Sequence, residues 1–190
     1  MPQKAKFSKE EIVEAGIKIL RKDGPEAVTA RAIGDILNSS ARPIFTVFES
    51  MGEVLEGIKE RAMDIYTEYV NKGLSKEKAF KGVGEEYIRF SKEEPKLFQF
   101  LFMNKVEKTY DISNILPGID DNYEKILKSI TDEYPVKKED ALSLYKHLWV
   151  YSHGIATLIA SGMCDFSDGE IGDMLTEVFK AILIEKMKGR

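Results

Sequence analysis

Signals that start and stop helices recur along this chain, and no segment shows the alternation typical of a β-strand. Ser8 and Glu11 form an S-x-x-E capping box, and Gly24 stands where the helix that they open would end. Ser50 and Glu53 repeat the capping box before a second helical segment. No Asn-Gly hairpin signal occurs, and β-branched residues do not alternate over any long run. The sequence therefore predicts an all-α protein.

The periodicity of apolar residues places the expected helices. Two short helices follow the first, one from Thr29 to Asn38 and one from Ala41 to Phe48, in which Pro43 is acceptable because it falls in the first turn. Residues 104–121, which include Pro117-Gly118, are expected to form a mobile loop. Longer helices are predicted at about 50–70, 75–92, 95–103, 119–132, 137–161 and 168–187.

The composition fits one or two packed domains and argues against several kinds of site. Of 190 residues, 43% are hydrophobic and 32% are charged, which is enough apolar material for a core. Cys164 is the single cysteine, and the two histidines are His147 and His153, so neither a disulfide framework nor a Cys- or His-based metal centre is expected. We expect no cofactor and no metal.

The N-terminal residues predict a cytoplasmic protein. Residues 1–6 contain no apolar stretch of the kind found in signal peptides. The longest apolar stretch, Leu148 to Met163, is short for a membrane span and contains His153. We therefore expect no membrane partner.

Charge is distributed unevenly. Residues 1–48 carry eight Lys or Arg and six Asp or Glu, a net charge of +2, which leaves −6 for the remainder of a chain whose total is −4. A basic N-terminal segment on an acidic body is typical of a small DNA-binding module attached to another domain, although chance variation over 48 residues accounts for it equally well.

The two short helices and the turn between them form a helix-turn-helix pattern. In such a unit the second helix enters the major groove of DNA, and here that helix is predicted at Ala41 to Phe48. Ile44 and Phe48 would pack inward, while Arg42, Phe45 and Thr46 would face outward.

At this point the sequence resembles the TetR family of transcriptional regulators. The family pattern of a glycine after the first helix, Thr-x-Arg-x-Ile, a turn with Ser, and an aromatic-rich recognition helix corresponds to Gly24, Thr29–Ile33, Asn38–Ser40 and Ile44–Phe48. The likeness covers roughly residues 7–60. It implies a DNA-binding domain at 1–50, joined by a long helix to a ligand-binding and dimerisation domain at 51–190.

The resemblance also implies which residues contact a double-stranded DNA operator. Val47 and Met51 stand where the family commonly has a histidine and a phosphate-binding lysine, so the contacts would depend on the arginines, on Thr46 and on backbone N–H groups at the start of the helix after Ser50. Ordinary solvated surface is the alternative interpretation of Arg31 and Arg42. The predicted DNA-binding residues are Arg31, Ser40, Ala41, Arg42, Phe45, Thr46 and Ser50.

Aromatic residues and methionine gather in the body of the chain, where they could line an apolar cavity for a small effector. Phe98 and Phe102 share a helix face, and His153 is the one histidine on an apolar helix, where it could bind a ligand or be a satisfied core histidine. Plain core packing is the alternative for the whole set. The predicted ligand-binding residues are Met63, Tyr66, Tyr87, Phe90, Phe98, Phe102 and His153.

The last two expected helices are too apolar for a chain that stands alone. The helix at 137–161 has apolar residues on more than one face, and the helix at 168–187 has one wide apolar face. A symmetric homodimer is the commonest way to cover such faces, and the resemblance implies a four-helix bundle between subunits. The predicted interface residues are Leu148, Ile155, Leu175, Val178 and Ile182.

Together these features predict a ligand-responsive, homodimeric DNA-binding regulator, a repressor that a small apolar effector releases. Two alternatives remain open: a helical dimeric protein whose vestigial head does not bind DNA specifically, and an all-helical enzyme. No Gly-rich phosphate loop, H-E-x-x-H or Gly-x-Ser-x-Gly motif occurs, so we expect no catalytic residues.

Overall fold

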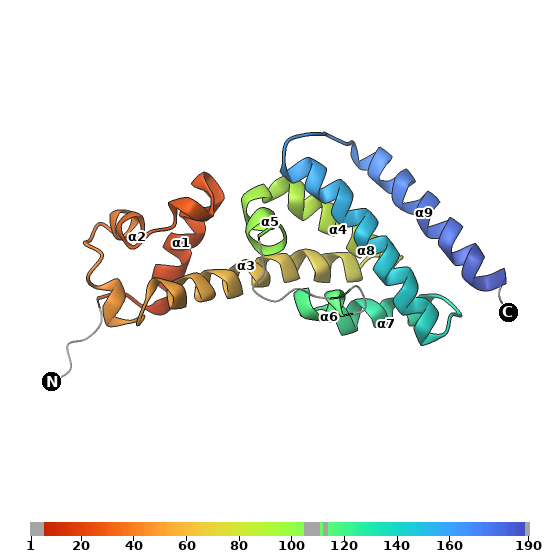
Figure 1. Ribbon diagram of the computed structural model, residues 1–190, viewed down its shortest axis with the longest axis horizontal. Helices are drawn as coiled ribbons and strands as arrows, with labels where there is room; N and C mark the ends of the chain where they lie inside the picture. The colour runs from red at the N-terminus through yellow and green to blue at the C-terminus, as the bar shows by residue number, and fades with distance from the viewer. Residues whose placement is uncertain (1–5, 105–110, 112–113, 189–190) are drawn as a thin grey trace. The chain divides into compact units, whose positions relative to one another are not determined.

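The computed structural model describes residues 6–104, 111 and 114–188, and every regular element in those ranges is a helix (Figure 1). This confirms the all-α prediction. The α-helices are α1 (Lys9–Asp23), α2 (Ala30–Ile36), α3 (Met51–Leu74), α4 (Ala79–Glu93), α5 (Pro95–Phe102), α6 (Ile115–Ile119), α7 (Tyr123–Glu133), α8 (Lys138–Ala160) and α9 (Asp168–Lys188). Short 3₁₀ helices follow α1, at η1 (Pro25–Ala27), and α2, at η2 (Ile44–Thr46).

The chain divides into two compact units. The N-terminal unit contains residues up to 65 together with 94–103, and the C-terminal unit contains 66–93 and the residues from 104 onward. The helix α3 contributes to both. The sequence predicted a DNA-binding domain at 1–50 and a second domain at 51–190, and this functional division remains a prediction. In the structure α5 packs against α1 and belongs to the N-terminal unit.

The first helix has the ends that the sequence predicts. Ser8 Oγ accepts a hydrogen bond from the Glu11 backbone N–H at 3.2 Å, and the Glu11 carboxylate accepts one from the Ser8 N–H at 2.8 Å. Gly24 ends α1 with φ of +89°, a conformation that favours glycine. Arg21 at the end of α1 makes two hydrogen bonds, of 2.9 and 2.7 Å, to the Glu94 carboxylate just before α5.

The predicted recognition helix at Ala41–Phe48 is wrong in length and type. The structure has only the three-residue 3₁₀ helix η2 there. Thr46 and Val47 are β-branched and lower the helix propensity of a segment that is already short. In addition, the Thr46 hydroxyl donates to the Pro43 carbonyl at 2.6 Å, and Val47 leaves helical geometry with φ of −120°.

Part of the predicted loop at 104–121 is helical. The short helix α6 contains Pro117-Gly118, a pair that the sequence pattern indicated as a break. Pro117 lies in the first turn of α6, where its missing N–H leaves no helical hydrogen bond unmade. Residues 105–110 and 112–113 of that loop lie outside the described residues.

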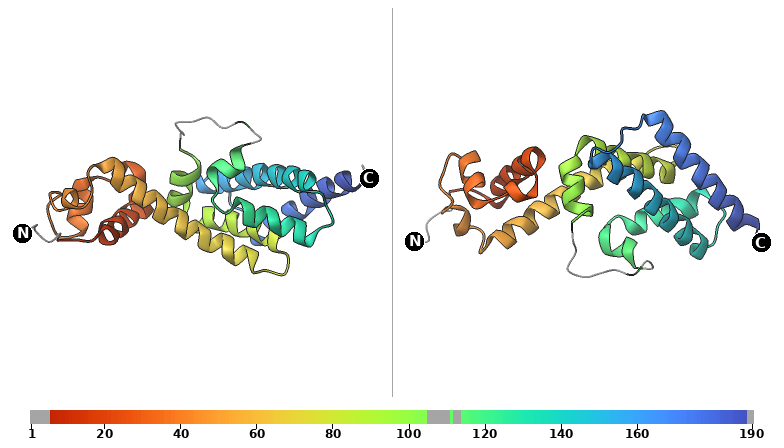
Figure 2. Two further views of the ribbon diagram at one scale, coloured as in Figure 1. Left: turned by 90° about the horizontal axis from the view of Figure 1, so that it is seen from below. Right: turned by 45° about the horizontal axis from the view of Figure 1, so that its top comes forward.

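In the C-terminal unit α4 packs against α7, α8 and α9, and α8 also packs against α7 and α9. Figure 2 shows α4 and α8 side by side from two directions. The end of α3 approaches the start of α4 closely, because a Cβ on Gly73 would lie 2.6 Å from the Val83 Cα. Only glycine permits this contact of backbones.

Within the described residues, no helix combines the length and the apolar character that crossing a bilayer requires.

Candidate functional site

The predicted DNA-binding residues lie around the turn between α2 and the start of α3. Ala41 is half-buried, and the other six are exposed. The Phe45 side chain is 46% exposed. The exposed members are Arg31 on α2, Ser40 and Arg42 in the turn, Phe45 and Thr46 on η2, and Ser50 before α3.

The cations of the N-terminal unit differ in what they contact. Lys9 forms an ion pair with Glu53 at 3.0 Å, and Arg21 is bound to Glu94, so both are neutralised within the unit. Arg31 and Arg42 are exposed and make no hydrogen bond or ion pair with any described residue. Their guanidinium groups are therefore available to an external anion such as a phosphate.

Two hydroxyl groups near this turn already serve the fold. Ser50 Oγ accepts the Glu53 backbone N–H at 3.2 Å and caps α3, which leaves its hydrogen free to donate. The Thr46 hydroxyl hydrogen is used on the Pro43 carbonyl. Lys6 was not among the predicted residues, yet its Nζ donates to Ser39 Oγ at 3.0 Å and so brings another cation to the turn.

The C-terminal unit contains a cavity of about 340 Å³, near the lower end of the usual range for small-molecule sites. Aromatic side chains from α3, α4, α8 and α9 form much of its wall. Its lining residues are Tyr66, Lys78, Phe80, Lys81, Val83, Gly84, Tyr87, Asp120, Ile126, Tyr134, Tyr145, Leu148, Trp149, Ser152, Leu175, Thr176, Phe179, Lys180 and Leu183.

A carboxyl group is buried in the wall of this cavity. Asp120 is 4% exposed, and its Oδ2 accepts a hydrogen bond from the Tyr66 hydroxyl at 2.7 Å. Its Oδ1 accepts from the backbone N–H and the side-chain amide of Asn122, at 2.8 and 3.2 Å. Burial raises the pKa of the Asp120 carboxyl, and the hydrogen bonds from Tyr66 and Asn122 oppose this shift.

Two more tyrosines of the cavity lining, Tyr145 and Tyr87, lie within the electrostatic influence of Asp120. The hydroxyl group of Tyr145 is buried without a hydrogen-bond partner among the described residues. Tyr87 Oη shares a hydrogen bond of 2.9 Å with His153 Nδ1, and the Trp149 ring stacks on the His153 ring with centroids 5.0 Å apart. Burial raises the pKa values of both tyrosines, and the charge of Asp120 adds to the effect.

Lysines lie where the cavity meets solvent. Lys78 and Lys180 are exposed and have no ion-pair partner among the described residues, while Lys81 lies 3.7 Å from the Glu85 carboxylate. The cavity thus has exposed positive charge at its mouth and a buried acid inside.

Only some of the predicted ligand-binding residues come together here. Tyr66 and Tyr87 line the cavity, and His153 contacts it through Tyr87. Phe90 packs against the Tyr66 ring, with centroids 5.5 Å apart, but does not line the cavity. Met63, Phe98 and Phe102 belong to the N-terminal unit, where Phe98 is completely buried.

The predicted dimer-interface residues differ in how deeply they are buried. Leu148, Ile155 and Leu175 are buried within the C-terminal unit, and two of them, Leu148 and Leu175, line the cavity. They therefore have little surface left for a partner. Val178 and Ile182 are half-buried.

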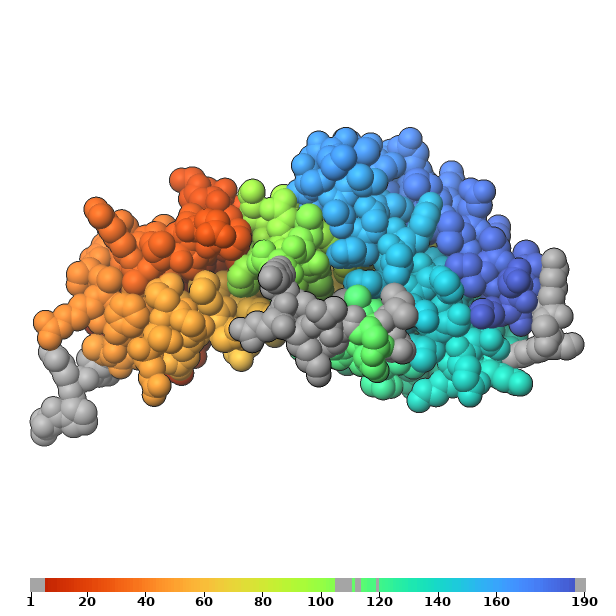
Figure 3. Space-filling model, viewed as in Figure 1, coloured from red at the N-terminus to blue at the C-terminus, as the bar shows by residue number. Residues whose placement is uncertain are grey.

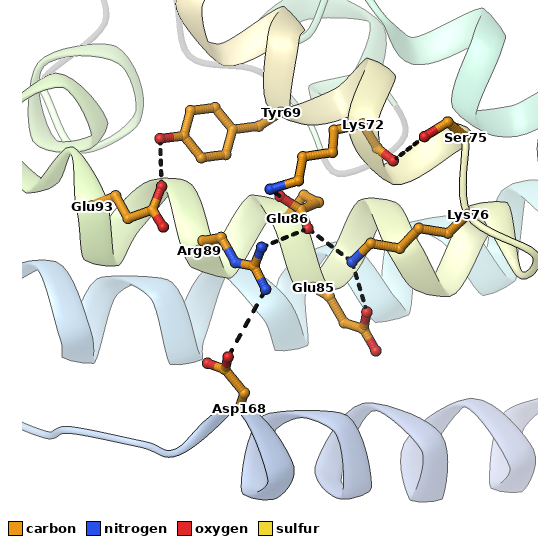
Figure 4. A network of polar contacts seen from close by, with 9 residues as sticks. All are labelled: Tyr69, Lys72, Ser75, Lys76, Glu85, Glu86, Arg89, Glu93 and Asp168. Carbon is orange, nitrogen blue, oxygen red and sulfur yellow. Dashed lines mark hydrogen bonds and ion pairs between the residues drawn. The ribbon is translucent and has the colours of Figure 1, made fainter.

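A second polar cluster in the same unit is structural. Glu86 is completely buried, and its carboxylate lies 2.8 Å from Lys76 Nζ, 3.3 Å from Lys72 Nζ and 3.2 Å from Arg89 Nη1 (Figure 4). Burial favours a raised pKa for Glu86, but Lys76, Lys72 and Arg89 outweigh it and lower the pKa. The cluster joins the end of α3 to α4.

The sequence contains a pattern for part of the cavity of which the predicted ligand-binding residues on α4 and α8 include only Tyr87 among those that line it. Tyr145, Leu148, Trp149 and Ser152 follow helical spacing on α8, as Phe80, Val83, Gly84 and Tyr87 do on α4. Asp120 had no such signal, because it lies just after α6 in a segment predicted to be a loop.

No protein-family model matches this sequence, and a search of curated proteins finds no match. Among solved structures, the chain is similar to a Clostridium perfringens protein with the name "putative fatty acid metabolism regulator". The TM-score is 0.62 at 17% sequence identity, and the match covers 90% of this chain and 97% of that one. At this identity the likeness shows a shared helical fold.

Proposed function

We propose that this protein is a DNA-binding transcriptional regulator, a repressor of the TetR type that a small effector releases. The observation that carries the proposal is the pair Arg31, on α2, and Arg42, in the turn after it, two exposed guanidinium groups that have no partner among the described residues. Phosphates and guanine edges are the groups that arginine at such a turn binds best. The name of the similar Clostridium perfringens structure agrees with a regulatory role.

The cavity of the C-terminal unit supports an effector site. It is enclosed largely by aromatic and aliphatic side chains and contains a few buried polar groups, the usual composition of a small-molecule site. For the effector to release DNA, it must bind one conformation of the protein more tightly than another. The C-terminal unit is therefore the proposed sensor.

A homodimer through α8 and α9 completes the proposal. The outer surfaces of these helices adjoin in the space-filling view (Figure 3), and they carry exposed Val150 and Ile184 besides the half-buried Val178 and Ile182. Val150→Glu and Ile184→Glu should give monomers in sedimentation equilibrium, since a charge in an apolar interface loses its hydration. Met163→Glu, in the exposed connection between the helices, is the control and should leave the dimer intact.

The DNA-binding test starts from selection of a site out of random duplex DNA, followed by salt titration. A dimer should select a pseudo-palindrome whose half-sites are about 34–36 Å apart. Arg42→Ala should cost about 1–3 kcal/mol per half-site and relax specificity at one base pair if Arg42 contacts a guanine. A phosphate contact would instead weaken binding to all sequences alike and reduce the salt dependence.

Arg31→Ala makes the same test from α2, and Lys18→Ala, an exposed cation on α1, is the matched control. If folded Arg31→Ala and Arg42→Ala proteins bind the selected site as tightly as the wild type, the proposed surface is wrong.

A second candidate has its own support, namely a helical ligand-binding protein whose head does not bind DNA specifically. The segment expected to enter the major groove forms only the three-residue helix η2, which offers fewer aligned side chains than an α-helix. For this candidate, the selection should yield no enriched sequence, and any binding should vanish as salt is raised.

A further inference from the structure

We propose that the inner end of the cavity binds the protonated amine of a ligand whose remaining body is apolar. This inference rests on the proposed function, because it identifies the chemical class of the effector. It comes from four residues that line the cavity, Asp120, Tyr66, Tyr87 and Tyr145, of which Tyr66 contacts both Asp120 and Tyr87. Each of these residues is at most 4% exposed.

The first step is the charge of Asp120. A carboxylate removed from water needs a cation or a full set of hydrogen bonds to be stable. Asp120 has three hydrogen bonds, but no cation from the described residues pairs with it. A ligand that brings a positive charge into the cavity would supply this missing partner.

The second step is the hydroxyl of Tyr145. Tyr145 lines the cavity, and its hydroxyl group is buried and has no hydrogen-bond partner among the described residues. Buried polar groups nearly always have a partner, so a polar atom of a ligand is the natural one. An ammonium group has several N–H donors, so it can donate both to the Tyr145 oxygen and to the Asp120 carboxylate.

The third step is the aromatic wall. The rings of Tyr66 and Tyr87 meet edge to face with centroids 5.9 Å apart, and the rings of Tyr145 and Trp149 line the same cavity. Faces of aromatic rings attract cations, particularly where water is excluded. The same wall gives the apolar body of the ligand a surface to pack against.

The lysines at the mouth of the cavity favour a negatively charged ligand, so their electrostatic effect must be compared with that of Asp120. Lys78 and Lys180 are exposed, and water and salt screen exposed charges strongly. The field of a buried carboxylate acts in a medium of lower dielectric constant and is therefore stronger at the same distance. The buried group should decide which charge is preferred inside the cavity.

The fluorescence of Trp149 gives a direct measurement, because it is the single tryptophan of the chain and lines the cavity. The probes are decylamine, decanol and decanoate, which share one chain length and carry positive, zero and negative charge at neutral pH. The wild type should bind decylamine roughly tenfold or more tighter than either other probe, as expected for a hydrogen bond to a charged group.

Variants then assign the preference to residues. Asp120→Asn should abolish the preference for decylamine over decanol. Tyr145→Phe should weaken decylamine binding by about two- to tenfold, and it keeps the test usable if Asp120→Asn does not fold, since the hydroxyl that it removes bonds to no described residue. Lys78→Gln and Lys180→Gln are the controls at the mouth and should not weaken decylamine binding.

The other results overturn the inference in distinguishable ways. Tightest binding of decanoate, lost in Lys78→Gln or Lys180→Gln, would mean an anionic ligand held at the mouth, and the proposed effector site would stand. Equal binding of all three probes would mean a purely apolar site, again without the proposed role of Asp120. No binding of any probe would remove both the inference and the effector site.

Discussion

The two units of this protein are built on different kinds of core. The N-terminal unit buries many aliphatic side chains: Ile12, Ile17, Ile33, Ile44 and Ile58 are all completely buried. The C-terminal unit buries several polar groups and leaves a cavity of about 340 Å³ unfilled. Unfilled volume and buried polar groups both reduce stability. The cavity and the buried polar groups are therefore expected to make the C-terminal core the less stable of the two.

The largest expected difference between the units concerns two phenylalanines. Phe98→Ala removes a completely buried ring from the N-terminal unit and should cost about 3–5 kcal/mol of unfolding free energy. Phe80→Ala should cost less, because part of the Phe80 ring faces the cavity and has fewer contacts to lose. Urea unfolding followed by circular dichroism compares the two.

The variants Phe98→Ala and Phe80→Ala also distinguish a role in core packing from a role in ligand binding. Phe98→Ala should leave the affinity of the cavity for decylamine unchanged, whereas Phe80→Ala should alter it, because Phe80 lines the cavity and Phe98 does not. Loss of probe binding in a folded Phe98→Ala protein would contradict the division of the core that we describe.

The next largest effect is expected at the buried carboxylate of the C-terminal unit. Glu86→Gln removes the charge that three cations surround and should cost about 1.5–3 kcal/mol, as for hydrogen bonds to charged groups. Glu85→Gln, one residue earlier, is the control. Glu85 shares the partner Lys76 but is partly exposed, so its loss should cost about 0–1 kcal/mol.

The pH dependence gives a second measurement of Glu86. Its pKa in the folded protein lies below the ordinary value of 4.5, so its contribution is complete above pH 4.5 and is lost as the pH falls through the folded-state pKa. The stability of Glu86→Gln should therefore decline less in acid than that of the wild type. Equal acid dependence of the two proteins would mean that Glu86 is not held ionised by its neighbours.

Local signals in the sequence predicted the helices well where one residue decides a boundary. The capping box of Ser8 and Glu11 and the stop at Gly24 are confirmed, because they act within a single turn of chain. The recognition helix was wrong because the pattern of Ile44 and Phe48 marks only which residues face inward, and both are indeed buried on η2 and after it. Periodicity alone does not distinguish an α-helix from a short 3₁₀ turn.

The cavity was harder to predict, because it depends on which helices meet. The sequence pattern around an aromatic residue on a helix is the same whether the residue fills a core or lines a cavity. Phe98 is an example of the first case and Phe80 of the second. The role of Asp120 in the cavity is visible only in the folded protein, where the Tyr66 hydroxyl, distant in the sequence, lies 2.7 Å from the Asp120 carboxylate. Tertiary contacts of this kind leave no mark in a single sequence.

A smaller effect is expected at the N-termini of two helices, α1 in the N-terminal unit and α8 in the C-terminal unit. Ser8 caps α1 through its side chain, whereas Lys137 before α8 makes no such hydrogen bond. Ser8→Ala should therefore cost about 0.5–2 kcal/mol, and Lys137→Ser should stabilise α8 by up to a similar amount. Thermal unfolding followed by circular dichroism measures both changes. A loss of stability in Lys137→Ser would show that the Lys137 side chain has a packing role that capping does not replace.

The smallest expected change in stability is at Tyr145, and it tests whether the C-terminal unit is adapted to a ligand. Tyr145→Phe removes a buried hydroxyl that has no partner among the described residues, so no hydrogen bond within them is lost. Because an unsatisfied buried group is unfavourable, the unliganded variant should be as stable as the wild type or more stable by up to about 1 kcal/mol.

Saturating decylamine should reverse this order of stability, because only the wild type gains a hydrogen bond at position 145. Urea unfolding with and without decylamine, followed by Trp149 fluorescence, measures both quantities. Destabilisation of the unliganded variant would mean that the Tyr145 hydroxyl already has a partner inside the protein, which would contradict its proposed role in binding a ligand.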